Sequence, residues 1–368
     1  KKIGQTNSEE IKRLGKDEKT GNEVFTTKEM HTIEKENLAY VNKNIQLEPI
    51  MSKEQATRGI SDFEKEYFTL SDGQRDAAMH ILTSTDQVGA TQGLAGSGKS
   101  VMFKSIAHSM KYNDNNTEVL VSAVANKAVS GAVEASTMNS GESFTGQTLH
   151  KATRGGLKEV MGANDSEHKT EVKPQTKLLI IEEASMASAS DVHKILKDVE
   201  ELRKEGTNVK VQLVGDTNQL LPIGAGSPFE QIQKALGDSV VQMPESQRQR
   251  NQQQQDVTEP IAKKDIRKSL ENLEKAGALK EVKDPEERIK AVVNAITKKE
   301  SVDIQNFKGE TETKNIDYKN TIGLAATNKE NKAINLGVRA KLKEEGLIKN
   351  EVKTTINVGV LKDNIKQS

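Results

Sequence analysis

The chain has no cysteine, no tryptophan and few aromatic rings, with seven Phe and four Tyr among 368 residues. The lack of cysteine excludes a disulfide framework, a thiolate metal site and a cysteine nucleophile, and it fits a reducing, cytoplasmic compartment. No run of apolar residues approaches the ~18 needed for a membrane span, and no targeting peptide is recognisable. We therefore expect a core built from aliphatic side chains, in a protein without membrane contact.

The chain also lacks a net charge, because 54 basic side chains balance 54 acidic ones. Neutrality argues against a globally basic, histone-like nucleic-acid binder, so any anion must be bound by local positive charge. The six His residues are scattered and form no metal-binding trio beside a nucleophilic Tyr. The first residues, Lys-Lys without an initiator Met, suggest that other domains of a larger polypeptide adjoin this chain.

The composition and the apolar pattern along the sequence predict three regions. Residues 1–68 are charged and are expected to form an N-terminal helical region, with a helix start at Thr26–Glu29. Residues 69–245 alternate short apolar strands with amphipathic helices, which is typical of a parallel sheet covered on both faces. Residues 246–368 begin beside a glutamine-rich patch and contain an expected strand at 321–326 that would open a second α/β unit. In the middle region the expected strands are Val88–Gln92, Val119–Ala123, Leu178–Ile181 and Val209–Val214.

The segment Gly93–Ser100 matches the pattern G-x-x-x-x-G-K-[ST], between the first of these strands and an expected helix, Val101–Met110. Glycines let backbone N–H groups turn toward phosphates, and the helix N-terminus adds its positive end. Lys99 would reach the β- and γ-phosphates of ATP, while Ser100 would offer its hydroxyl to Mg²⁺. The alternative is a glycine-rich turn without a ligand. The residues of the expected phosphate site are Gly93, Ala95, Gly96, Ser97, Gly98, Lys99 and Ser100.

Two polar clusters follow later strands. Glu182 and Glu183 come directly after Leu178–Ile181, where one carboxylate could hold Mg²⁺ and the next could activate the attacking water. The alternative is an acidic helix cap. Gly215–Pro222 follows Val209–Val214, and its Gln219 could sense the γ-phosphate or the attacking water. The alternative there is an ordinary turn of Gly, Asp and Asn.

The order of these segments resembles superfamily 1 DNA helicases. The similar branch is the 5′-to-3′ group that contains the helicase part of conjugative relaxases and the exonuclease V alpha subunit. The matching segments are Gly93–Ser100 for motif I, Ser122–Ala128 for motif Ia, Thr148–His150 for the T-L-H element, Glu182–Ser185 for motif II, Gly215–Pro222 for motif III, Ser246–Gln249 for motif IV and Ala325–Arg339 in the second domain.

This resemblance implies an α/β fold, in which a P-loop RecA-like parallel-sheet domain is followed by a second, incomplete RecA-like domain. It also implies that Gln74 reads adenine and that Arg248 approaches the γ-phosphate. Single-stranded DNA would be held by a basic track and a stacking ring. The expected DNA-binding residues are Lys127, Phe144, Thr148, His150 and Lys151.

Two features depart from the family pattern. Motif II usually begins with Asp, whereas position 182 is Glu, and the longer arm must still satisfy the octahedral geometry of Mg²⁺. Motifs V and VI, including a second arginine, have no counterpart after Arg339. We therefore expect an ATP-dependent helicase or translocase on single-stranded DNA. The alternatives are a nucleic-acid-binding module with a degenerate or truncated motor, and a P-loop enzyme, such as a kinase, that does not act on DNA.

Overall fold

The structure is a computed structural model that describes residues 10–16, 21–94, 96–113, 117–137, 144–162, 176–244, 252–262, 265–305 and 311–348. The chain divides into two compact units, Lys1–Gln249 and Arg250–Ser368. All residues of the predicted nucleotide site fall within the first unit, and two of them, Ala95 and Arg248, lie outside the described ranges.

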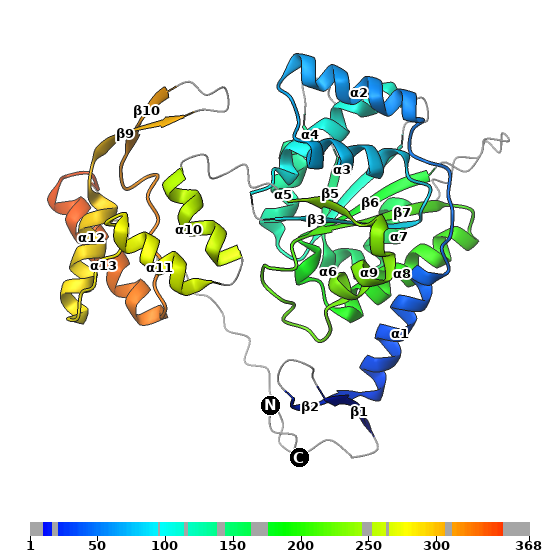
Figure 1. Ribbon diagram of the computed structural model, residues 1–368, viewed down its shortest axis with the longest axis horizontal. Helices are drawn as coiled ribbons and strands as arrows, with labels where there is room; N and C mark the ends of the chain where they lie inside the picture. Colours follow the sequence, from blue (N-terminus) through cyan, green and yellow to red (C-terminus); the bar gives the residue numbers. More distant parts are fainter. Residues whose placement is uncertain are drawn as a thin grey trace. The chain divides into compact units, whose positions relative to one another are not determined.

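The first unit is built on a six-stranded sheet with the order β5-β4-β6-β7-β3-β8 (Figure 1). Every neighbouring pair is parallel, and β3 lies between β7 and β8. This topology confirms the predicted P-loop RecA-like α/β fold. The strands are β3 (Val88–Gly93), β4 (Val119–Ala123), β5 (Thr145–Thr148), β6 (Thr176–Glu182), β7 (Asn208–Gly215) and β8 (Val241–Met243).

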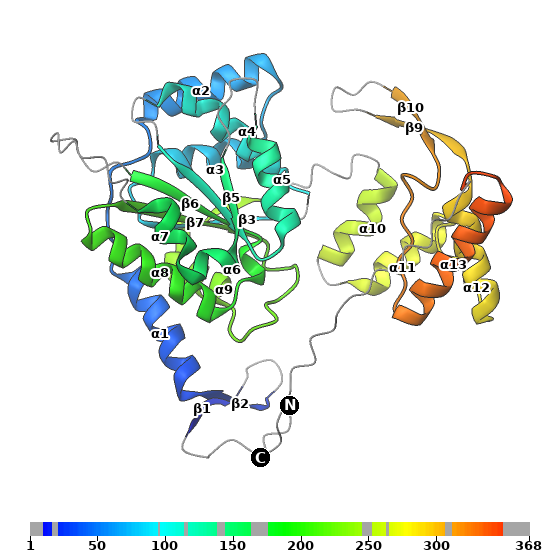
Figure 2. The same ribbon diagram turned by 180° about the vertical axis from the view of Figure 1, so that it is seen from behind.

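Helices cover both faces of this sheet (Figures 1 and 2). Along β6, Leu178 and Ile180 join one apolar core, whereas Leu179 and Ile181 join the other, because successive side chains point to opposite faces. Burial on both faces explains why the central strands are almost continuously apolar. One face carries α2 (Lys53–Glu66), α3 (Asp72–Thr83), α4 (Lys99–Ser109) and α5 (Asn126–Ser136), and the other α1 (Lys28–Asn42), α7 (Leu157–Met161), α8 (Ala189–Lys204) and α9 (Pro228–Leu236).

A lysine of the sheet, Lys210, is buried against the carboxyl end of α3. Lys210 on β7 is 1% exposed, and its Nζ donates to the carbonyl oxygens of Ile81 and Ser84, each at 2.9 Å. These carbonyls belong to the carboxyl end of α3 and the residue that caps it, where a helix lacks intrahelical partners. Burial lowers the pKa of Lys210 to about 8. The lysine therefore ties the end of α3 to the centre of the sheet.

The N-terminal region contains an antiparallel hairpin as well as helices. Strands β1 (Ile11–Lys16) and β2 (Glu23–Thr27) pair with each other, and Thr27 then caps α1, where the sequence predicts a helix start. The prediction of a wholly helical region missed this hairpin. Its second strand, Glu-Val-Phe-Thr-Thr, is rich in β-branched and aromatic residues, which favour extended backbone.

The second unit combines helices with the antiparallel hairpin β9–β10. The expected strand at 321–326 is wrong, since that segment pairs with no other strand in the described part of the chain. Ile322 and Leu324 are 83% and 85% exposed, so their apolar character does not reflect burial here. A second RecA-like domain stays a prediction. The elements are α10 (Gln252–Ala262), α11 (Ile266–Lys275), α12 (Pro285–Thr297), β9 (Glu300–Gln305), β10 (Thr311–Ile316) and α13 (Asn328–Glu344).

Candidate nucleotide site

Three strands bring the predicted residues to one edge of the sheet. The glycine-rich loop follows β3, the paired carboxylates end β6, and the Gly215–Pro222 loop follows β7. Because β6, β7 and β3 are consecutive, parallel neighbours, their carboxyl ends lie side by side. In open α/β sheets this edge is where ligands bind.

The loop after β3 has the backbone geometry of an anion site. Gly96 and Gly98 both have φ +83°, a left-handed conformation that glycine adopts without a side-chain penalty. Gly98 precedes α4 and offers no side chain to cap it, so the first N–H groups of the helix remain directed toward the loop. Ala95 lies outside the described residues.

The side chains of Lys99 and Ser97 both lie against this loop. The Nζ of Lys99 donates to the carbonyl oxygen of Gly93 at 3.0 Å, which folds the ammonium back over the loop. The Oγ of Ser97 is buried without a hydrogen-bond partner among the described residues. Ser100, the next residue of α4, is exposed and can reach a ligand at the helix N-terminus.

Gln74 connects helix α3 to the same loop. Its Nε2 donates to the carbonyl oxygen of Ser97 at 2.9 Å, and its Oε1 accepts from the backbone N–H of Ser71 at 3.1 Å. The side chain is 5% exposed. A side chain on Gly98 would collide with this amide, since its Cβ would lie 2.2 Å from Gln74 Nε2. The structure thus places Gln74 against the loop, and adenine recognition stays a prediction.

The carboxylates after β6 differ in their surroundings. Burial, then the neighbouring charge of Glu183, raises the pKa of Glu182 to about 7, while Lys99 opposes the shift. The Oε2 of Glu182 is buried and has no hydrogen-bond partner in the described part of the chain. Glu183 itself has φ +51°, an uncommon conformation for a residue with a side chain. Such strain often marks functional positions.

Gly215 allows the turn after β6 to lie close to β7. A Cβ at this position would lie 3.0 Å from the N of Ser185 and 3.1 Å from the N of Ala184, both backbone atoms. It would also lie 3.0 Å from the Phe229 ring. The glycine of the predicted motif III therefore makes room for the strained turn at Glu183.

The residues around Glu182 fit a magnesium ion. Mg²⁺ prefers oxygen ligands. The partnerless Oε2 of Glu182 and the exposed hydroxyl of Ser100 are oxygens at the same sheet edge, carried by β6 and by the start of α4. A cation would also remove the penalty of an uncompensated buried carboxylate.

The loop after β7 is organised by Asp216, which is 3% exposed. Its carboxylate accepts from the Gln219 amide at 3.3 Å and from the Gln92 amide at 3.0 Å. Gln219 is exposed and oriented by Asp216. Gln92 is a residue of this site that no sequence motif predicts, although a glutamine near the end of an otherwise apolar strand is a usable signal of polar contacts at the strand end.

The predicted DNA residues separate into surface and core. Lys127, His150 and Lys151 are exposed near the carboxyl ends of β4 and β5, which are adjacent, parallel strands. The Thr148 hydroxyl accepts from the N–H of Lys151 at 3.3 Å and thereby caps α6 (Leu149–Lys151). Phe144 is 5% exposed and packs in the core, so its predicted role as a stacking ring is wrong. Arg248 lies outside the described residues.

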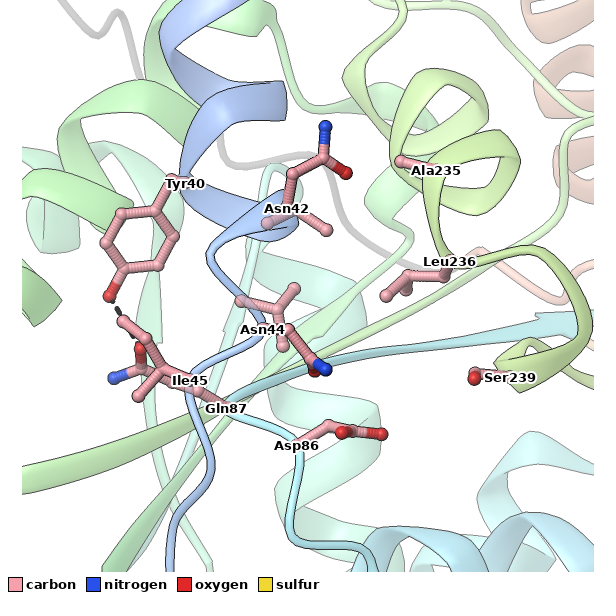
Figure 3. A pocket seen from close by; sticks show the side chains of 11 residues that line it. Tyr40, Asn42, Asn44, Ile45, Asp86, Gln87, Ala235, Leu236 and Ser239 are labelled. Carbon is pink, nitrogen blue, oxygen red and sulfur yellow. Dashed lines mark hydrogen bonds between the residues drawn. The ribbon is translucent and has the colours of Figure 1, made fainter.

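A separate pocket lies at the opposite edge of the sheet, at the start of β3 (Figure 3). It has a volume of about 330 Å³ and is lined by the end of α1, the residues before β3 and the end of α9. The Tyr40 hydroxyl donates to Gln87 Oε1 at 2.9 Å beside it. Burial, together with the charge of Glu200, raises the pKa of this tyrosine to about 12. The pocket shares no residue with the glycine-rich loop.

Comparison with known proteins agrees with the P-loop geometry. Residues 69–284 match the family model described as an AAA domain, which covers more than half of the chain. The chain belongs to this AAA domain family. The matched segment begins just before α3 and includes the glycine-rich loop, both carboxylates and the loop after β7. No helix in the described ranges is long and apolar enough to cross a membrane.

Two curated relatives of this AAA-domain protein share fewer than a third of their aligned residues with it. A "Probable conjugal transfer protein TraA" from Sinorhizobium fredii is 26% identical over 279 residues, which are 76% of this chain and 22% of the relative. An "Uncharacterized protein MJ1519" from Methanocaldococcus jannaschii is 28% identical over 236 residues, 58% of this chain and 19% of that relative. The chain thus spans about a fifth of the length of these relatives.

Proposed function

We propose that this AAA-domain protein is an ATP-driven motor on single-stranded DNA. It would be the helicase part of a larger conjugative-transfer protein, related to the 5′-to-3′ branch of superfamily 1. The observation that carries the proposal is the meeting of Lys99, Glu182 and Gln219 at the ends of three neighbouring strands. The motif order and the similarity to a conjugal transfer protein favour DNA as the second substrate.

The proposed chemistry is hydrolysis of the terminal phosphate of ATP. Lys99 would leave the Gly93 carbonyl and bind the β- and γ-phosphates. Mg²⁺, held by Ser100 and Glu182, would offset phosphate charge. Glu183 would accept a proton from the water that attacks the γ-phosphorus, as the bond to the β–γ bridging oxygen breaks and ADP leaves. Arg248 is proposed to stabilise the developing charge.

The DNA strand is proposed to cross the carboxyl ends of β4 and β5. Lys127, His150 and Lys151 are exposed there. With Phe144 buried, this track relies on phosphate contacts rather than on base stacking. Since each lysine–phosphate contact releases counterions, affinity for an oligonucleotide should fall steeply with salt.

Single-turnover ATP hydrolysis with and without a single-stranded oligonucleotide tests the motor. We expect DNA to stimulate hydrolysis, and Lys99→Ala to reduce the stimulated rate by about two orders of magnitude or more, because the phosphate contact is lost. Lys104→Ala is the matched control, since Lys104 lies on the same helix but is exposed. Equal rates for the two variants would contradict the proposal.

A binding module without motor activity is the second candidate. Glu182 favours it, because a longer carboxylate stands at the metal position and holds its proton to about pH 7. On this alternative the oligonucleotide binds tightly, ATP does not change its affinity, and hydrolysis stays at background. Measuring oligonucleotide affinity by fluorescence anisotropy with and without ATP separates the two candidates.

A further inference from the structure

We propose that Gln92 is a positioning residue that transmits occupation of the P-loop to the loop carrying Gln219. The inference rests on the proposed function of the nucleotide site, and it names the regulation of that site. Gln92 is the last residue before Gly93 on β3. It lies at the junction between the phosphate loop and the loop after β7.

The side-chain amide of Gln92 makes three contacts away from its own strand. Its Nε2 donates to Asp216 Oδ1 at 3.0 Å. Its Oε1 accepts from the N–H of Thr217 at 3.2 Å and from Nε2 of Gln233, on α9, at 2.9 Å. Each end of the amide thus contacts the start of the loop after β7, and its oxygen also contacts α9.

Asp216 extends the connection to Gln219. Its Oδ1 also accepts from the N–H of Asn218 at 3.0 Å, and its Oδ2 accepts from Gln219 Nε2 at 3.3 Å. Because Asp216 is 3% exposed, solvent screens these contacts little. The position of Gln219 is therefore set by Asp216, and the position of Asp216 is set in part by Gln92.

The other end of the connection reaches the phosphate lysine. Lys99 Nζ donates to the carbonyl oxygen of Gly93, the residue that follows Gln92. If Lys99 moves to a phosphate, this carbonyl loses the lysine as a donor, and the hydrogen bonding next to Gln92 changes while β3 stays paired with β7 and β8. The lysine thus has two alternative partners, and the choice between them biases the Gln92 contacts. Such a two-position group is the physical requirement for coupling between sites.

The loop that would respond is exposed and apolar. Beyond Gln219, Leu220 and Leu221 are 72% and 66% exposed, and Ile223 is 100% exposed. A reporter on this loop can therefore be placed without disturbing the core. Since the chain has no native cysteine, Leu221→Cys provides a single labelling position for an environment-sensitive fluorophore.

The test measures two quantities in the labelled full chain: affinity for a slowly hydrolysed ATP analogue with Mg²⁺, and the fluorescence change of the loop on binding. Gln92→Glu keeps the two acceptor contacts but removes the donor to Asp216. We expect its nucleotide affinity to stay within about threefold and its loop response to fall about tenfold, as for loss of one charge-assisted hydrogen bond. Gln92→Leu, which removes all three contacts without adding a charge, should give the same loss.

Reversing the polarity of the contact supplies the rescue. In the double variant Gln92→Glu with Asp216→Asn, the asparagine NH2 can donate to the new carboxylate while its oxygen still accepts from Gln219, but the acceptor for the Asn218 N–H is lost. Part of the loop response should therefore return. Gln242→Glu is the matched control, because Gln242 is exposed and pairs with Gln92 in the register of β8. It should leave affinity and response unchanged.

The outcomes separate the two proposals. If the unsubstituted chain binds no nucleotide, the proposed function fails and the coupling fails with it. If it binds nucleotide but the loop response is absent, or survives both Gln92→Glu and Gln92→Leu, the coupling role is overturned while the nucleotide site stands. A lost response that the double variant does not recover even in part would overturn the role of the Gln92–Asp216 contact and leave Gln92 with local packing only.

Discussion

At the scale of single residues, Glu182 combines the cost of burying a carboxylate with a proposed role in holding Mg²⁺. Its buried oxygen has no partner in the described ranges, and its pKa is raised to about 7. An unpaired buried carboxylate destabilises a folded protein, so this one fits a role that needs its charge, such as holding a cation. A cation that binds here would stabilise the fold and prepare the site for phosphate at the same time.

Glu182→Gln should stabilise the protein measured without nucleotide or magnesium. The folded state holds this proton to higher pH than the unfolded state, whose carboxyl titrates near 4.5. The stability contributed by protonation is therefore complete below about pH 4.5 and is lost as pH rises through 7. We expect a gain of about 1–3 kcal/mol in the free energy of unfolding at pH 8 and about a quarter of that gain at pH 5. Urea unfolding at the two pH values measures it.

An exposed glutamate on α5, Glu134, provides the control for this prediction. Glu134→Gln should change the free energy of unfolding by less than about 0.5 kcal/mol at either pH. A gain in Glu182→Gln that is equal at pH 5 and pH 8 would show that the buried charge is not its cause.

At the scale of elements, the sequence predicts the central strands of the sheet more reliably than its outer strand β5 or the strands of the second unit. The runs at 119–123 and 209–214 became β4 and β7, because both faces of a central strand must be apolar. Strand β5, Thr-Gly-Gln-Thr, has no such apolar pattern. It is extended because it pairs with β4, and that contact cannot be read from its own four residues. Conversely, the apolar run at 321–326 forms no strand, because pairing needs a partner that local sequence does not specify.

The candidate site shows the same division. Lys99 and Glu182 could be predicted because phosphate and metal binding use residues that are close together in the chain, in a glycine-rich loop and in a pair of carboxylates. Gln92 and its link to Asp216 were hidden because residues 124 positions apart meet only through the sheet. Phe144 was misplaced because an isolated aromatic residue looks the same in sequence whether it stacks on a base or fills a core.

Lys210→Met should weaken the connection between α3 and the sheet. The change leaves the carbonyls of Ile81 and Ser84 without their buried donor, so we expect a loss of about 1–3 kcal/mol in the free energy of unfolding at pH 7. The loss should grow between pH 8 and 10.5. In that window the unfolded lysine still binds a proton that the folded one has released, so the stability of the unsubstituted chain rises with pH.

Chemical denaturation across this pH range measures the effect, with Lys194→Met on the exposed side of α8 as the control. A Lys210→Met variant as stable as the parent would show that the buried ammonium contributes no net stabilisation.

At the scale of the whole molecule, the nucleotide site and both apolar core clusters belong to the first unit. Every residue of these clusters precedes Pro244. A unit with its own core is expected to fold alone. We therefore predict that a fragment of residues 1–249 unfolds cooperatively and binds ATP and Mg²⁺ with an affinity within about threefold of the full chain.

Isothermal titration and thermal unfolding of the two chains test this independence. The fragment should retain binding that Lys99→Ala removes. A soluble, folded fragment with affinity more than about tenfold weaker would mean that residues after 249 contribute directly to the nucleotide site.

The place of β3 between β7 and β8 has a consequence for the time at which the phosphate loop can form. Both neighbours are synthesised later than β3, and Gln92 pairs in register with Gly215. At ~5–20 residues per second, the ribosome needs on the order of ten seconds to deliver β7 after β3 has emerged. During that interval the strand has two open edges, the condition under which chains associate wrongly. Nascent chains that stop before residue 208 should therefore depend on chaperones, whereas those that have passed β8 should not.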